Sequence, residues 1–507
     1  MKTFSTITEL LSIGEAPQTA LAAPGRTPMT FAQLREHVTA TICALNEAGI
    51  GRGDRVAIVL PNGPEMASAF VCVAAGATSA PLNPAYRPEE FEFYLTDLNA
   101  KALIVLRGDE TPARNVAQRL KIPVIELLAD TNGAAGNFSL SAAQNGKATN
   151  PGPASSDDIA LILHTSGTTS RPKIVPLTQR NVCASARNVR DTLRFTASDR
   201  GLNIMPLFHI HGLIAGLLAP LAAGGQVHCT PGFNALKFFA WMNEAKPSWY
   251  SAVPTMHQTI LSRAANNANA IAANPLRFIR SSSASLPPQV LLELEKVFNC
   301  PVIESYGMTE AAHQMASNPL PSAKRIPGSV GIAAGPDVAI MNESGEILPR
   351  ESVGEIVIRG ENVTPGYENN PNANAEAFTH GWFRTGDQGV MNAEGYLTLT
   401  GRLKEIINRG GEKISPREVD DVLMDHPAVQ QVITFAMPHD KLGEDVAAAV
   451  VLREGASATE KELREFVGQR VADFKVPRKI VFLAEIPKGA TGKLQRIGLA
   501  AKLGLVP

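Results

Sequence analysis

A run of small polar residues between His164 and Lys173 is the part of the sequence best suited to chemistry. It reads His-Thr-Ser-Gly-Thr-Thr-Ser-Arg-Pro-Lys and follows an apolar run, residues 159–163, whose length suits a buried strand. Hydroxyl and backbone N–H groups donate hydrogen bonds to phosphate oxygens, Gly167 admits close approach, and Lys173 adds a positive charge. The run lacks the Walker spacing Gly-x-x-x-x-Gly-Lys-Ser/Thr. We therefore predict a phosphate-binding loop of another kind, with a polar surface turn as the alternative.

Five further polar motifs follow this loop in order along the chain. Singly, each fits a solvated turn, because Gly, Thr and Asp are common turn residues and Lys is usually exposed. Their joint occurrence in one chain argues against five unrelated surface turns. They are Glu-Ser-Tyr-Gly-Met-Thr-Glu at 304–310, Gly-Trp-Phe-Arg-Thr-Gly-Asp at 381–387, Gly-Arg-Leu-Lys-Glu at 401–405, Arg-Gly-Gly-Glu-Lys-Ile-Ser-Pro at 409–416 and Pro-Lys-Gly-Ala-Thr-Gly-Lys at 487–493.

The loop and these motifs resemble the motif series of the adenylate-forming acyl-CoA synthetases, the AMP-binding enzymes. That superfamily includes acyl- and aryl-CoA ligases, firefly luciferase and peptide-synthetase adenylation domains. The resemblance covers nearly the whole chain. It departs at Ile174, where the family usually has Gly after Pro-Lys, but position 173 keeps its Lys. The resemblance implies an enzyme that activates a carboxylic acid with ATP and transfers the acyl group to CoA.

The implied reaction explains the residue types. A carboxylate attacks the α-phosphate of ATP while pyrophosphate leaves, so two anions approach each other and charge builds on phosphoryl oxygens. By resemblance, Lys493 bridges the carboxylate and the α-phosphate, and Glu310, with Thr165, binds Mg²⁺. Thr309 touches the α-phosphate, and His209 shapes the carboxylate end. The implied ATP and AMP contacts are Thr165, Ser166, Gly167, Thr168, Thr169, Lys173, Ser283, Ala284, Ser285, Glu304, Ser305, Tyr306 (against the adenine), Asp387 (on the ribose hydroxyls), Arg402, Asn408 and Lys413.

The second half-reaction, attack of the CoA thiolate on the acyl-adenylate, requires a different arrangement of the same site. By resemblance, the C-terminal domain rotates about a hinge at Lys404. The rotation withdraws Lys493 and brings in Gly410 and Gly411, whose missing side chains leave room for the pantetheine arm of CoA. Asn408 and Lys413 are the nucleotide-side contacts implied for the first state.

The segments that match the acyl pocket of the related ligases are polar in this chain. The implied acid contacts are His211, Ser281, Ser283, His313 and Gln314. Imidazoles and hydroxyls are poor partners for a hydrocarbon chain and suit a small acid with a second carboxylate. Segments 164–173, 250–257, 278–286 and 408–416 also resemble the oxalate-activating branch of the family. The implied substrate is therefore oxalate.

Alternatives to this hypothesis remain at the level of sequence. The acid could be another short or medium carboxylic acid, with the histidines serving as packing or water-bonded residues. The chain could instead be an adenylation module that feeds a carrier protein, or a luciferase-like oxygenase. A nucleotide-binding pseudoenzyme would lack a catalytic residue, yet every implied catalytic residue is present.

Composition narrows the protein class. The 507 residues exceed what one hydrophobic core usually serves, and the net charge of -1 gives no reason to expect nucleic acid as a partner. The 5 cysteines form no C-x-x-C pair, which suits a reducing compartment. No apolar run is long enough to span a bilayer, and acidic residues interrupt the N-terminal region that a signal peptide would need. Cytoplasm is the expected compartment; the oligomeric state is not predicted.

The elements that must position these residues are predicted from hydrophobic patterning. Strand-like runs at 55–60 and 101–106, with an Ala-rich helix from Glu65, indicate parallel-rich sheets covered by helices. Residues 130–156 are rich in Gly, Ala, Asn, Ser and Pro and predict a loop. Short strands and tight turns at 353–400 predict a small β-barrel-like part. We expect an α/β fold with an adenylation domain at 1–401, a hinge at 402–404, and a small mobile α+β lid domain at 405–507.

Overall fold

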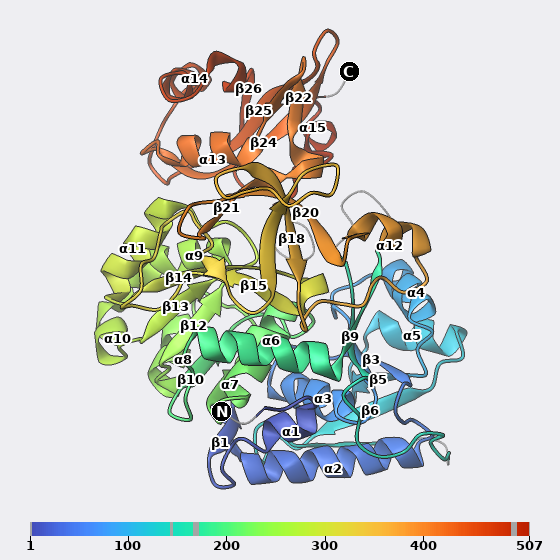
Figure 1. The fold of residues 1–507 in the computed structure, drawn as a ribbon. Coiled ribbons are helices and arrows are strands. Elements are labelled where there is room, and N and C mark those ends of the chain that lie inside the picture. The colour runs from blue at the N-terminus through green and yellow to red at the C-terminus, as the bar shows by residue number, and fades with distance from the viewer. Residues whose placement is uncertain (1–2, 142–145, 166–171, 488–493, 506–507) are drawn as a thin grey trace.

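The computed structural model describes residues 3–141, 146–165, 172–487 and 494–505. Within these residues the chain forms a large α/β unit and, after residue 402, a smaller α+β unit (Figure 1). The smaller unit, orange to red in Figure 1, lies over the end of the large unit that carries the antiparallel β-rich part. The predicted fold class is therefore confirmed.

One sheet of the large unit contains the two strands that flank the predicted phosphate-binding loop. Its central strands run parallel and its two edge pairs are antiparallel. The strands predicted at 55–60, 101–106 and 159–163 are confirmed in it. The order is β7 (Phe138–Leu140), β6 (Val124–Ala129), β5 (Ala102–Leu106), β3 (Arg55–Val59), β4 (Thr78–Pro81), β8 (Ile159–His164) and β9 (Ile174–Thr178).

The predicted phosphate-binding loop connects the antiparallel strands β8 and β9, so its two ends are held together by ladder hydrogen bonds. His164 pairs with Ile174 in this register. Ile174 is buried in a cluster with Ile162, which explains the departure from the usual Gly: the side chain fills core space beneath the strand. The loop residues Ser166, Gly167, Thr168 and Thr169 lie outside the described residues.

The other large sheet carries most of the predicted site. Strands β10 to β14 pair in parallel, and β15 returns antiparallel against β14. The order is β16 (Ile332–Ala333), β15 (His313–Ser317), β14 (Val302–Met308), β13 (Phe278–Ser281), β12 (Trp249–Ala252), β10 (Arg200–Asn203), β11 (Gln226–Cys229), β1 (Thr19–Ala22) and β2 (Met29–Thr30).

Helices pack against both sheets. Every residue of α3 except Glu65 is buried, as expected for a helix that is apolar on all sides, and Glu65 pairs with Arg26 at 2.9 Å. No helix in the described ranges is long and apolar enough to cross a membrane. The helices are α1 (Ile7–Leu11), α2 (Phe31–Glu47), α3 (Pro64–Ala74), α4 (Pro88–Asp97), α5 (Pro112–Arg119), α6 (Gln179–Thr192), η1 (His211–Leu218), α7 (Ala219–Leu221), α8 (Phe238–Ala245), α9 (Pro254–Ala264), η2 (Ala265–Asn267), α10 (Ala268–Ala273), α11 (Pro288–Phe298), η3 (Thr309–Ala311) and α12 (Pro371–Ala377).

The predicted loop at 130–156 contains one short strand, which corrects that prediction. Phe138–Leu140 forms β7 and pairs antiparallel with β6. The ring of Phe138 meets that of His37 edge-on at 4.2 Å between centroids. Three residues are too few for an alternating pattern to be read, so only the tertiary contact reveals the strand.

The β-rich part predicted at 353–400 is an antiparallel sheet. Its strands are β17 (Asp337–Met341), β18 (Val353–Arg359), β20 (Trp382–Met391), β19 (Phe378–Thr379) and β21 (Leu397–Arg402). Its register places Asp387 opposite Arg402.

The C-terminal unit contacts this sheet through the start of its first helix. The Ser415 hydroxyl donates to the Thr400 carbonyl, and Arg417 donates to the Leu399 carbonyl at 2.8 Å. The elements after β21 are η4 (Leu403–Glu405), β22 (Ile407–Arg409), β23 (Glu412–Ile414), α13 (Pro416–Met424), β24 (Val429–His439), β25 (Gly443–Leu452), α14 (Glu460–Gly468), η5 (Asp473–Lys475), β26 (Lys479–Phe482) and α15 (Leu499–Lys502).

Candidate active site

The predicted ribose contact, Asp387, is held from two sides. Tyr306 Oη donates to its Oδ2 at 2.5 Å, and Arg402 Nε donates to its Oδ1 at 2.9 Å. Tyr306 lies on β14 and Arg402 on β21, so two sheets meet at this carboxylate. Asp387 lies opposite Arg402 in the register of β20 and β21, which brings the motifs at 381–387 and 401–405 into contact. The arrangement fixes an anionic acceptor in one orientation, as recognition of a vicinal diol requires.

The predicted metal contact, Glu310, lies in a turn that a distant segment holds. Thr364 N donates to the Glu310 carbonyl at 2.7 Å, and Tyr367 Oη donates to Oε1 of Glu310 at 2.8 Å. Lys173 Nζ lies 4.3 Å from the centroid of the Tyr367 ring, within the range of a cation–π contact. Tyr367 therefore connects the phosphate-loop lysine to the buried carboxylate. The sequence motifs did not identify Tyr367; the turn Thr-Pro-Gly before it was the available signal.

The chemistry at Glu310 fits Mg²⁺. The carboxyl group is buried, and desolvation raises its pKa, so the charged form lacks sufficient compensation from the protein. A cation supplies that compensation. No group of three or more His, Cys, Asp or Glu side chains that could hold a metal ion occurs in the described residues. One carboxylate with ATP phosphates and water is the usual mode for Mg²⁺.

The flanks of the phosphate loop are ordered by hydrogen bonds between its ends. Thr165 N donates to the Lys173 carbonyl at 3.0 Å, and Lys173 N donates to Thr165 Oγ1 at 3.0 Å. Both side chains are half-buried beside the loop. Thr309, also half-buried, begins the turn that carries Glu310.

The predicted adenine slot lies at the ends of β13 and β14. Ala284 and Ser285 are exposed, whereas Glu304 and Ser305 on β14 are buried. Glu304 Oε1 accepts from Leu286 N at 3.2 Å, and burial raises the pKa of Glu304 to about 7. Ser305 Oγ donates to the Ser281 carbonyl at 3.3 Å, which ties the two strand ends together.

Two histidines and a serine of the predicted acid pocket are in contact. His211 Nδ1 lies 3.0 Å from Ser283 Oγ, and its Nε2 lies 2.6 Å from Oγ of Ser251 on β12. The rings of His211 and His313 stack with centroids 5.0 Å apart and planes at 18°. His211 is the first residue of the π-helix η1, a helix type that often marks functional sites. The predicted acid site therefore brings together four segments that are remote in sequence.

Beside the histidines lies Arg280, a residue that the sequence motifs did not assign. It is fully buried on β13, and its Nη1 lies 3.3 Å from His211 Nε2. Its Nη2 donates to Gln314 Oε1 at 3.3 Å. Burial lowers the pKa of Arg280 to about 9, so the guanidinium is still charged at neutral pH. The signal was available, because Arg280 directly follows the apolar pair Phe278 and Ile279, and a buried Arg is costly unless it has a task.

Gln314, a predicted acid contact, is hydrogen-bonded to three protein groups. Its Nε2 donates to Thr192 Oγ1 and to the Ala334 carbonyl, both at 3.1 Å, while its Oε1 accepts from Arg280. These three hydrogen bonds orient the amide toward Arg280. We therefore propose that Gln314 holds Arg280 in place rather than binding the acid directly. Ser281 is fully buried at the end of β13.

Strained backbone marks the same pocket. Ser283 has φ 75° and His313 has φ 107°, in a region that non-glycine residues rarely adopt. Such conformations cost on the order of 1–3 kcal/mol each and persist where the surrounding structure imposes them. A Cβ on Gly307 would lie 1.9 Å from the His313 carbonyl, so the close approach of β14 and β15 requires glycine there.

His209 precedes the π-helix. Its N donates to the Pro206 carbonyl at 3.3 Å, and its ring centroid lies 4.6 Å from that of Phe208. It is half-buried, two residues before His211.

The C-terminal contacts lie on a hairpin of the small unit. Asn408 and Lys413 pair across β22 and β23, with Gly410 and Gly411 at the tip in positive-φ conformations of 60° and 100°. All four are exposed, and no contact in the described parts of the chain joins them to Asp387 or Glu310. Lys404 is exposed in η4, between the two units. Lys493 lies outside the described residues.

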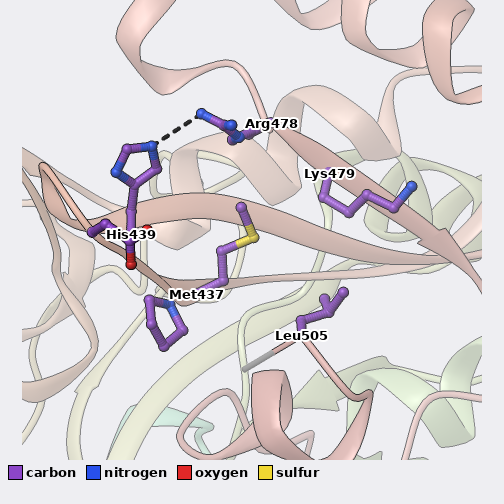
Figure 2. A pocket seen from close by; sticks show the side chains of 7 residues that line it. Met437, His439, Arg478, Lys479 and Leu505 are labelled. Carbon is purple, nitrogen blue, oxygen red and sulfur yellow. Dashed lines mark hydrogen bonds between the residues drawn. The ribbon is translucent and has the colours of Figure 1, made fainter. Parts of the chain in front are cut away.

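A surface pocket of about 490 Å³ lies elsewhere on the C-terminal unit (Figure 2). Arg478 Nη1 lies 3.0 Å from His439 Nε2 at its edge. None of its lining residues is a predicted site residue: they are Met437, Pro438, His439, Asp440, Arg478, Lys479 and Leu505.

Comparisons with known proteins agree with this architecture. The AMP-binding enzyme family matches residues 14–368, and its C-terminal domain family matches residues 418–493. The chain belongs to the AMP-binding enzyme family. Since its CoA ligase relatives match along nearly its full length, it is an AMP-forming acyl-CoA synthetase that uses ATP, CoA and a small-molecule acid.

Two curated relatives and one solved structure are similar to the chain over most of its length. The chain is 46% identical to the oxalate–CoA ligase of Arabidopsis thaliana over 486 residues, covering 94% of each chain. It is 43% identical over 473 residues to the oxalate–CoA ligase of Saccharomyces cerevisiae, covering 88% of this chain and 86% of the relative. Among solved structures it matches the ATP-bound MatB from Rhodopseudomonas palustris with a TM-score of 0.89 at 28% identity, over 98% of both chains.

Proposed function

We propose that this acyl-CoA synthetase is an oxalate–CoA ligase. It converts ATP, oxalate and CoA into AMP, diphosphate and oxalyl-CoA through an oxalyl-adenylate. The observation that carries the proposal is the polar cluster of buried His211 and His313 with half-buried Ser283 at the predicted acid end of the site. The sequence identity of 46% and 43% to two oxalate–CoA ligases supports the proposal independently.

The cluster fits a small, polar acid. A hydrocarbon chain packed against these imidazoles and hydroxyls would offer them no hydrogen bond in place of water, at a cost of about 1–3 kcal/mol for each polar group. Oxalate presents four carboxylate oxygens, which accept such donors without enlarging the pocket. The strained backbone at Ser283 and His313 supports a role beyond packing.

In adenylate formation the protein positions two anions and stabilises the charge between them. Asp387 and Arg402 orient the ribose, and the loop flanks at Thr165 and Lys173 hold the terminal phosphates. Lys493 offsets the repulsion between the carboxylate and the α-phosphate. Glu310 would hold Mg²⁺, which would supply neutralisation of the phosphate charge.

Thioester formation then requires the C-terminal unit to rotate about Lys404. The rotation carries Lys493 away and places the Gly410–Gly411 tip at the pantetheine path. The exposed tip has open space around Gly411, which is compatible with a passing ligand arm.

The test is AMP release with and without CoA across oxalate, malonate, acetate, hexanoate and 4-coumarate. CoA-dependent turnover that strongly favours oxalate is the expected result. Turnover that favours hexanoate or coumarate would keep the ligase mechanism and refute oxalate, leaving a CoA ligase for another short or medium acid.

A His313→Val variant tests the pocket itself. The apolar side chain should lower oxalate turnover and improve use of an acid such as hexanoate. Unchanged oxalate turnover in this variant would contradict the assignment of His313 to the acid.

A further inference from the structure

Arg280 is a buried cation without a counter-ion in the described structure. Its relative exposure is 0%, and no Asp or Glu in the described ranges forms a salt bridge with it. Its two hydrogen-bond partners are the imidazole of His211 and the amide of Gln314, both at 3.3 Å. Its Nε has no hydrogen-bond partner among the described residues. A buried charge is costly unless it is paired, so an anion beside Arg280 would be stabilised there.

The contact with Arg280 favours one tautomer of a neutral His211 ring. A guanidinium only donates hydrogen bonds, so Nε2 of His211 is the acceptor of the Arg280 Nη1–H group. In the neutral ring the proton then lies on Nδ1, which faces Ser283 Oγ at 3.0 Å. The Ser251 hydroxyl then donates to Nε2 at 2.6 Å. The ring thus presents an N–H donor on the Ser283 side and a cation behind it, and the cation strengthens that donor.

The reaction itself determines which substrates can compensate Arg280. Adenylation converts the reacting carboxylate into a mixed anhydride, so that group no longer carries its charge. A monocarboxylate therefore leaves the buried guanidinium unpaired once the adenylate has formed. An acid with a second anionic group keeps one negative charge in the pocket throughout the first half-reaction.

We propose that Arg280 selects acids with a second negative group. Its positive charge strengthens the N–H donor of His211, and this donor favours a negative group on the substrate. This inference rests on the proposed function, because it places the second carboxylate of the acid beside His211. Arg280 is a positioning residue here: it acts through His211, and Gln314 holds it through a hydrogen bond.

The experiment compares wild type, Arg280→Met and Arg280→Lys with oxalate and with glyoxylate, which has the same size but one carboxylate. The preference for oxalate, as the ratio of the two kcat/KM values, should fall on the order of 100-fold in Arg280→Met. Most of the loss should appear in KM for oxalate rather than in kcat, and Arg280→Lys should recover part of the preference.

Thermal stability separates this role from a structural one. Replacing an unpaired buried cation by an apolar side chain of similar length should leave Tm unchanged or raise it. A lower Tm with a parallel loss for both acids would mean that Arg280 serves the fold, and an unchanged oxalate preference would equally overturn the proposal.

The acid preference of the wild type distinguishes the two proposals. If wild type prefers malonate to oxalate, the oxalate assignment fails and the same comparison, malonate against acetate, tests Arg280. If wild type prefers a monocarboxylate, both proposals fail. If wild type prefers oxalate and Arg280→Met keeps that preference, only the Arg280 proposal fails.

Discussion

Tyr306 Oη donates a hydrogen bond of 2.5 Å to Asp387 Oδ2 across 81 positions of sequence. It joins β14 of the large mixed sheet to β20 of the antiparallel sheet. Arg402 engages the other oxygen, so the carboxylate is oriented before any nucleotide binds. Such preorganisation reduces the entropic cost of nucleotide binding.

Tyr306→Phe removes that hydrogen bond while keeping the ring. We expect KM for ATP to rise about fivefold with little change in kcat, because one net hydrogen bond contributes about 1 kcal/mol and acts on binding. Steady-state kinetics with varied ATP measure this. Tyr396→Phe is the matched control, since its hydroxyl donates to the Lys324 carbonyl in another part of the large unit. Equal effects of the two variants would contradict a specific role for Tyr306.

Glu310→Gln removes the buried carboxylate proposed to hold Mg²⁺. The rate of adenylate formation should fall on the order of 100-fold, and half-maximal activity should need more Mg²⁺, because an amide is a weaker ligand for a hard cation. Pyrophosphate exchange at varied Mg²⁺ measures both. Tyr367→Phe, which removes only the hydrogen bond to Oε1, should give a much smaller change. An unaltered Mg²⁺ requirement in Glu310→Gln would exclude this residue as the metal contact.

Glu304 should make stability depend on pH. Burial raises its pKa to about 7 from the ordinary 4.5, so between these values the folded state binds more protons than the unfolded state. Protonated Glu304 stabilises the folded state fully below about pH 4.5. The free energy of unfolding then falls as the pH rises from about 4.5 to about 7. Glu304→Gln keeps the acceptor for Leu286 N and removes the titration.

Relative to wild type, Glu304→Gln should gain up to about 3 kcal/mol of stability at about pH 8 compared with about pH 4. Thermal melts of both proteins at the two pH values measure the difference. Identical pH dependence of the two Tm values would show that Glu304 does not titrate in this window.

Gly307→Ala tests the approach of the two strands that form the acid pocket. A Cβ there would lie 1.9 Å from the His313 carbonyl, so β15 must move and displace His313. We expect a lower Tm and a larger loss of kcat/KM for the acid than for ATP. Gly468→Ala is the control, because its Cβ would meet Val476 at an ordinary 3.6 Å. A Gly307→Ala enzyme with normal acid kinetics would contradict the need for this spacing.

Domain alternation predicts opposite effects of two C-terminal changes. Lys493→Ala should abolish adenylate formation while largely sparing thioester formation from pre-made acyl-adenylate. Gly411→Leu should do the reverse, because a side chain there obstructs the pantetheine path. In the structure a Cβ on Gly411 has open space, although its φ of 100° adds backbone strain. Measuring the half-reactions separately tests this, and equal loss of both in each variant would oppose alternation.

Much of the molecule follows from local sequence. Apolar runs predicted β3, β5 and β8 because buried parallel strands are apolar on both faces, and the ordered motifs predicted which residues form the nucleotide site. Strand β7 was missed because three residues carry no readable period. The roles of Lys493 and of the loop at 166–169 remain predictions from resemblance.

The sequence by itself determined the family, and it predicted which residues do the chemistry. The tertiary structure decided which of them are in contact: Tyr306 with Asp387, Tyr367 with Glu310, and Arg280 with His211 and Gln314. These contacts depend on the order of strands in a sheet and on burial. Local patterns encode neither, because adjacent strands can be separated by any length of chain. The charge of Arg280 interacts strongly with nearby groups only because the fold buries it in the low-dielectric interior.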